Sequence, residues 1–105
     1  MHRLKRTNEP PFEFRGWLFY DSASKYASSR SRKKLEGFVR LYITDLRWVV
    51  LECVRFDKRN SLHVVRVVES IEDALEELAT LPLTVVSHEL YNDVMRDMAA
   101  LAKVS

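Results

Sequence analysis

The sequence contains few of the residues on which several classes of protein depend. Its 105 residues include one cysteine and two glycines. The single Cys53 cannot form an internal disulfide, so we expect a reducing, cytoplasmic setting. Two glycines are too few for a glycine-rich phosphate loop, and the sequence contains no Gly-x-Ser-x-Gly motif. Nucleotide-binding loops and serine hydrolases are therefore not expected.

Metal centres and other catalytic groups are also sparse. The three histidines, His2, His63 and His88, lie far apart in the sequence, and no second cysteine stands at ligand spacing. Cys53 lies among valines and leucines, where a thiol is usually inert core. Glu52 is expected to form a cross-strand ion pair with Arg40, Arg55 or Arg66 rather than to act as a general base. We therefore expect no enzymatic activity, no catalytic residues, no metal and no cofactor.

Long apolar runs are absent as well. No uninterrupted apolar stretch approaches the ~20 residues that span a bilayer. The charged start is followed by Asn8-Glu9-Pro10-Pro11 and not by the apolar segment of a signal peptide. We expect a protein that does not associate with membranes.

The charge that is present is divided between the two ends of the sequence. Residues 1–68 hold 15 Lys and Arg against 7 Asp and Glu, whereas residues 69–105 hold 2 against 8. The overall charge of +2 therefore conceals a basic, aromatic front and an acidic back. Such asymmetry bears on binding partners and not on the fold.

Apolar periodicity predicts four strands and then two helices. Alternation of period two covers residues 12–20, 35–44, 48–56 and 62–69, joined after residue 44 by short polar turns. Gly16 indicates a bulge or a close backbone approach. Ser70 begins a capping-box-like start for a helix over 71–80, and Thr84 or Ser87 caps a second helix. We predict an α+β fold, a four-stranded antiparallel meander followed by two helices on one face.

The domain organisation follows from this order of elements. Residues 1–11 are polar and end in two prolines, which favour extended backbone and cannot continue a helix. We interpret them as a flexible basic arm and residues 12–105 as a single α+β domain.

Two helices can cover only one face of the sheet, so strand alternation assigns each side chain to a face. The set expected beneath the helices is Phe12, Phe14, Leu18, Leu35, Val39, Leu41, Val49, Leu51, Cys53, Val65 and Val67. The opposite set is Trp17, Phe19, Phe38, Arg40, Tyr42, Trp48, Phe56, Val64 and Arg66.

Three interpretations of this aromatic face remain open. The arm or the 21–34 connection covers it, a protein partner or a second copy binds it, or nucleic-acid bases stack on its rings. The residues expected at a protein interface are Trp17, Phe19, Phe38, Tyr42 and Trp48. The residues expected to contact phosphates are Lys25, Arg30, Arg32, Lys33, Lys34 and Arg40.

The acidic helices support a different hypothesis. Glu72 and Glu76 lie in the first helix, and Glu89, Asp93 and Asp97 recur every four residues in the second. Such a surface is either a solvated outer face or a nucleic-acid mimic, which binds the basic groove of a partner protein in place of nucleic acid. We predict a non-enzymatic regulatory or accessory protein that binds nucleic acid or a nucleoprotein complex. The alternative is an inhibitor or adaptor that binds only protein, as a homodimer or with another partner.

Overall fold

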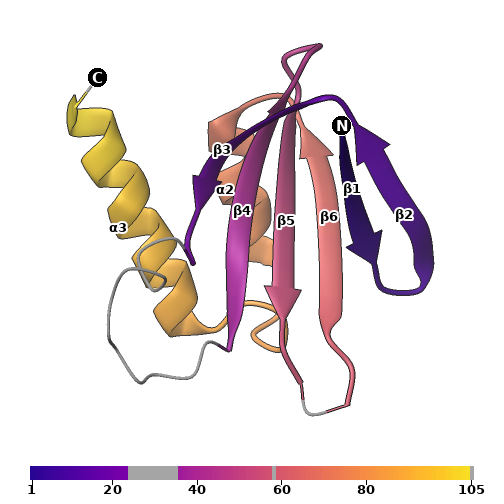
Figure 1. Ribbon diagram of the computed structural model, residues 1–105. Coiled ribbons are helices and arrows are strands. Elements are labelled where there is room, and N and C mark those ends of the chain that lie inside the picture. The colour runs from indigo at the N-terminus through magenta and orange to yellow at the C-terminus, as the bar shows by residue number, and fades with distance from the viewer. Residues whose placement is uncertain (24–35, 58, 105) are drawn as a thin grey trace.

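The computed structural model describes residues 1–23, 36–57 and 59–104, and its strands precede its helices. The elements are β1 (His2–Arg6), β2 (Glu9–Phe14), β3 (Gly16–Asp21), β4 (Gly37–Thr44), β5 (Val49–Arg55), β6 (Leu62–Val68), α2 (Ile71–Thr80) and α3 (His88–Val104). Strands β3 to β6 form a four-stranded antiparallel sheet in chain order, and β1 and β2 form a separate pair. Figure 1 shows α2 and α3 on one side of the larger sheet and the β1–β2 hairpin beside β6. The predicted meander with two C-terminal helices is confirmed.

Each of the two helices begins directly after a serine that caps its N-terminus. The Ser70 hydroxyl accepts a hydrogen bond from the Asp73 N–H at 3.0 Å, as the sequence predicts for α2. The cap of α3 is Ser87 and not Thr84, because the Leu90 N–H donates to the Ser87 hydroxyl at 3.2 Å.

The main core lies between the helices and the sheet. Its buried strand residues alternate along β4 and β5, as period two requires. They meet buried residues of α2, α3 and the connection between them. The cluster comprises Val39, Leu41, Val49, Leu51, Cys53, Ala74, Leu78, Val85, Val86 and Val94.

A second, smaller core lies on the opposite face of the sheet, beneath the hairpin. Leu4 and Phe14 of the hairpin are buried against Tyr42, Val50 and Val65 of the larger sheet. The hairpin is also tied to β6, since the Thr7 N–H donates to the His63 carbonyl at 3.0 Å. The sheet is therefore covered on both faces, by helices on one and by the hairpin over part of the other.

The predicted flexible arm is thus replaced by strand β1 and the start of β2. Arg6 is paired with Glu9, which leaves Thr7 and Asn8 as a two-residue turn with Asn8 at a φ of 63°. Asn is one of the few residues that adopts this left-handed backbone readily. Pro10 and Pro11 fit because β2 pairs with a strand on one side only. Because proline is rare within strands, Pro10 and Pro11 argue against a strand here when only the sequence is considered.

Two strands have the opposite side-chain assignment from the predicted one. Cys53 is paired with Val64 and Glu52 with Val65, so Val64 and Arg66 face the helix side while Val65 and Val67 face away. Because β6 has valines on both of its faces, alternation alone cannot decide which face points to the helices.

In β3 the reason for the wrong assignment is different. Trp17 is paired with Ile43 on the helix side, and Leu18 with Tyr42 on the other. The period-two pattern predicts one continuous strand over 12–20. The chain instead leaves β2 at Phe14, enters β3 at Gly16 and has a register shift between Leu18 and Tyr20. Leu35, also assigned to the helix side, lies outside the described residues.

Candidate nucleic-acid interface

The face of the sheet opposite the helices is only partly open. Tyr42, expected on an exposed aromatic face, is 4% exposed because the hairpin rings of His2 and Phe14 pack on it. The expectation that Tyr42 lies at an accessible interface is therefore wrong. Of the three interpretations, cover by the N-terminal segment applies to this half of the face.

A polar network borders the covered half. Arg40 Nε lies 3.2 Å from Asp21 Oδ2, and Arg40 Nη1 lies 3.9 Å from Glu52 Oε1. The Tyr42 hydroxyl donates to the same Glu52 oxygen at 2.9 Å. Glu52 is 5% exposed, and a buried carboxylate requires such partners. The predicted cross-strand pairing of Glu52 is confirmed, with Arg40 as its partner.

These contacts change how the groups of the network titrate. Burial, then the charge of Glu52 and the hydrogen bond to it, raise the pKa of Tyr42 to about 12. For Arg40, burial lowers the pKa, but the Asp21 carboxylate, together with Tyr42 and Glu52, offsets this and the net direction is upward. Arg40 is therefore a permanently charged group whose charge is already balanced by two carboxylates, and it has little left for a phosphate.

The open half of the face carries an aromatic pair. The rings of Phe38 and Phe56 lie 5.8 Å apart, and the Arg40 guanidinium carbon lies 4.1 Å from the Phe38 ring centre. Phe56 is 43% exposed. Arg40 therefore orients the Phe38 ring by a cation–π contact. Two adjacent rings with an accessible edge form the kind of platform on which bases stack.

Basic residues gather at the same end of the sheet. Arg55 ends β5, and the exposed Arg59 lies in the turn between β5 and β6. The Phe56 N–H donates to the Glu36 carbonyl at 2.8 Å, which places the residue before β4 beside the aromatic pair. The other cationic residues predicted to contact phosphates precede Glu36 and lie outside the described residues: Lys25, Arg30, Arg32, Lys33 and Lys34.

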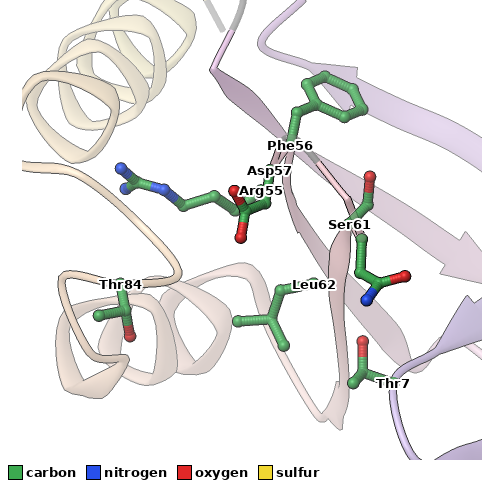
Figure 2. Close-up of a pocket in the computed structure, with 8 residues that line it drawn as sticks. Thr7, Arg55, Phe56, Asp57, Ser61, Leu62 and Thr84 are labelled. Atoms are coloured by element: carbon green, nitrogen blue, oxygen red, sulfur yellow. The ribbon is translucent and has the colours of Figure 1, made fainter.

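A pocket of about 550 Å³ opens at this end. Three separate segments line it: the β1–β2 turn, the end of β5 with the turn into β6, and the α2–α3 connection. Figure 2 shows Leu62 between Thr84 and Thr7, with the Arg55 side chain extended toward the α2–α3 connection. Arg55 Nη1 donates to the Leu83 carbonyl at 3.1 Å, and this bond holds the guanidinium plane. The lining residues are Thr7, Arg55, Phe56, Asp57, Asn60, Ser61, Leu62 and Thr84.

The remaining aromatic residues expected at an interface lie away from this pair. Trp17 and Phe19 on β3 are 44% and 46% exposed, and Trp48 beside the β4–β5 turn is 42% exposed. The Arg47 guanidinium carbon lies 5.4 Å from the Trp17 ring centre. The aromatic residues predicted to form one surface therefore fall into two separate groups. Phe38 and Phe56 form one group, Trp17, Phe19 and Trp48 form the other, and Tyr42 is covered by the hairpin.

The acidic stripe of α3 is only partly exposed: Glu89 is exposed, whereas Asp93 and Asp97 are half-buried. The Tyr20 hydroxyl donates to Asp97 Oδ2 at 2.5 Å, and Asp93 Oδ1 lies 3.7 Å from Arg96 Nη1. Burial and then the Asp97 hydrogen bond and charge raise the pKa of Tyr20 well above its usual value. Asp97 thus ties α3 to β3.

The lining of the pocket was missed by sequence reasoning. Thr7, Asn60, Ser61 and Thr84 come from three turns far apart in the chain. Only the polar cluster after Phe56 carries a local signal, and that signal predicts an ordinary turn.

Comparisons with family models, curated proteins and solved structures give no match for this chain. No helix in the described ranges is long and apolar enough to cross a membrane. Those ranges also contain no group of three or more His, Cys, Asp or Glu side chains placed to hold a metal ion.

Proposed function

We propose that this protein is a non-enzymatic regulatory or accessory protein that binds nucleic acid, free or within a nucleoprotein complex. The Phe38–Phe56 pair stacks on bases, and the cationic residues at the same end of the sheet neutralise phosphates. The Phe38–Phe56 ring pair carries this proposal, since its ring centres lie 5.8 Å apart on the uncovered half of the sheet and Phe56 is exposed.

The charges around the pair support the proposal. Within the described residues, neither Arg55 nor Arg59 has a carboxylate oxygen within 4 Å in an ion pair. The sequence holds five further cationic residues in the segment 24–34, which precedes Glu36. An accessible aromatic ring with cationic residues at the same end of the sheet is the combination that proteins use to stack on bases and contact the backbone of a single strand.

The experiment that tests the proposal compares two variants of matched exposure. We expect Phe56→Ser to weaken binding to a single-stranded RNA or DNA oligonucleotide by ~5- to 100-fold in gel-shift titrations, because base–aromatic stacking is lost. Leu101→Ser is the control, since Leu101 is 46% exposed on α3 against 43% for Phe56. Absence of binding to any DNA or RNA at low salt would overturn the proposal.

The phosphate contribution is tested separately by charge. Replacing Arg30, Arg32, Lys33 and Lys34 with Ala should weaken binding and flatten its dependence on salt, because fewer counterions are released. Arg96→Ala removes a cation that is 77% exposed on α3 and should leave the salt dependence unchanged. An unchanged slope in the quadruple variant would remove these four residues from the interface.

A second candidate function is protein binding alone, as a homodimer or with another protein. The exposed Trp17, Phe19 and Trp48 favour it, because Trp anchors many protein interfaces. Sedimentation at micromolar concentrations should then show a dimer or larger species that Trp17→Ser dissociates. A monomer at all concentrations, with no loss of partner capture in the variant, would contradict this candidate.

A further inference from the structure

We propose that the pocket between the β5–β6 turn, the β1–β2 turn and the α2–α3 connection receives one unpaired nucleotide of a single-stranded nucleic acid. This inference rests on the proposed function and adds the class of ligand and the place where a base is held. The pocket is distinct from the ring pair, although Phe56 belongs to both.

The size and lining of the pocket fit a nucleotide. Its volume of about 550 Å³ lies within the ~300–1,000 Å³ of ordinary small-ligand sites. Leu62 supplies an apolar surface between Thr84 and Thr7 (Figure 2). A flat heterocycle needs an apolar surface beneath its plane and polar groups around its edge, and this lining provides both.

The polar groups match the edges of a base and the charge of its phosphate. The Asn60 side-chain amide both donates and accepts, as Watson–Crick edges require, and Ser61 and Thr84 add hydroxyls that do the same. Arg55 is oriented by its hydrogen bond to the Leu83 carbonyl and has further N–H groups for a phosphate oxygen. The lining also includes the Asp57 carboxylate, which repels a bare anion but can accept a hydrogen bond from an exocyclic amino group of a base. An inorganic anion would gain only the contact with Arg55, whereas a nucleotide also gains the contacts of its base.

The position of Phe56 connects the pocket to the stacking surface. Phe56 lies at the pocket and its ring is paired with that of Phe38. Figure 2 shows the Phe56 ring pointing away from Leu62 and Thr84, so a strand whose bases stack on the two rings passes around the end of β5 to bring its next base into the pocket. A base inside a duplex is stacked and paired on both sides and cannot enter a concave site. The pocket should accordingly favour single strands.

Two variants test the inference without removing charge. Thr84→Phe fills the pocket, and Asn60→Ala removes its amide. Each should weaken binding of a ten-nucleotide single-stranded RNA by ~3- to 10-fold while leaving binding of the matching duplex unchanged. Neither should alter the slope of affinity against salt, because no phosphate-binding cation is lost. Thr80→Phe, on the exposed end of α2, is the matched control.

A direct readout uses mononucleotides and the intact chain. Adenosine and uridine monophosphate should shift the amide resonances of residues 60, 61 and 84 in heteronuclear NMR titrations, and Thr84→Phe should abolish these shifts. Far-UV circular dichroism and the melting temperature confirm that each variant folds.

The outcomes separate this inference from the proposed function. If Phe56→Ser weakens binding but Asn60→Ala and Thr84→Phe leave the preference for single strands unchanged, the pocket inference is overturned and the proposed function stands. Shifts produced equally by inorganic phosphate alone would also overturn it, since a nucleotide would then not be recognised. Absence of any nucleic-acid binding would overturn both.

Discussion

The hydroxyl of Tyr42 donates a hydrogen bond of 2.9 Å to the carboxylate of Glu52 on the neighbouring strand. Both residues are buried beneath the β1–β2 hairpin. Glu52 receives its other contact from Arg40 at 3.9 Å. A buried carboxylate with a single good donor depends strongly on that donor. This pair therefore marks the boundary between the covered and the open half of the sheet.

The first prediction removes this hydrogen bond. We expect Tyr42→Phe to lower the free energy of unfolding by about 1–3 kcal/mol, because Glu52 stays buried and loses its donor. Urea denaturation measures the change. Tyr91→Phe is the control: Tyr91 packs partly buried against the main core, and within the described chain its hydroxyl has no hydrogen-bond partner. Equal stability of the two variants would contradict the role assigned to Tyr42.

The second prediction concerns alkaline pH. Burial raises the pKa of Tyr42 and that of the Cys53 thiol each to about 12, from ordinary values of 10.0 and 9.0. The unfolded chain thus releases these protons near pH 9 to 10, whereas the folded chain retains them to about 12. Because the folded state binds more protons in this window, stability must fall as pH rises from about 9 to about 12.

The measurement is a series of urea denaturations at pH 7.5, 9, 10 and 11. Tyr42→Phe should flatten the decline, since each group contributes at most about 1.4 kcal/mol per pH unit. A free energy of unfolding that stays constant over this range in the natural sequence would show that the burial of these groups has no effect on their ionisation.

Much of this fold is predictable because its signals are local. The meander, α2 with its Ser70 cap, and the cluster of Val39, Leu41, Val49, Leu51 and Cys53 follow from period two, period 3.6 and one capping serine. Local signals fail in β6, where the odd-numbered and even-numbered positions are equally apolar. They also fail in β3, where a register shift changes which residues point to which face.

The hairpin and the site could not be derived from local pattern. Strand β1 contains one buried apolar residue, Leu4, and its stability comes from packing on Tyr42, Val50 and Val65 across the sheet. Of the residues in the proposed site, sequence reasoning names Phe38, Arg40 and the basic segment, and the basic segment lies outside the described residues. That Arg40 is neutralised by Asp21 and Glu52, and that Phe56 meets Phe38, depends on the strand register and not on the order of residues.

The third prediction tests the close approach of β3 to β4. A Cβ at Gly16 would clash with the Ile43 carbonyl oxygen, so Gly16→Ala must displace backbone. We expect a loss of about 1–3 kcal/mol in the free energy of unfolding. The neighbouring exposed residue supplies the control, since Arg15→Ala should change stability by no more than about 0.5 kcal/mol. A stable Gly16→Ala variant would show that the strands separate at this point at little cost.

The fourth prediction concerns the β4–β5 turn. Arg47 has a φ of 70°, a left-handed conformation that costs an ordinary residue about 1–2 kcal/mol. Arg47→Gly should therefore be more stable than Arg47→Val by about 1–2 kcal/mol, because a β-branched side chain is the least tolerated there. Thermal denaturation of both variants measures the difference. Equal melting temperatures would mean that the turn adopts another conformation in solution.

The last prediction separates binding of nucleic acid from imitation of it. Glu72 and Glu76 are exposed on α2, whereas Asp97 accepts the hydrogen bond of Tyr20 and is needed for structure. We expect Glu72→Ala with Glu76→Ala to leave nucleic-acid affinity unchanged or slightly raised, because two repulsive charges are removed. Asp97→Asn should instead lower stability by about 1 kcal/mol or more, since the acceptor loses its charge. Gel-shift titration and urea denaturation of the two variants measure these effects. If the Glu72 and Glu76 double variant abolished activity toward a basic partner while the Phe56 variant had none, the protein would be a nucleic-acid mimic, and the aromatic pair would not be its binding surface.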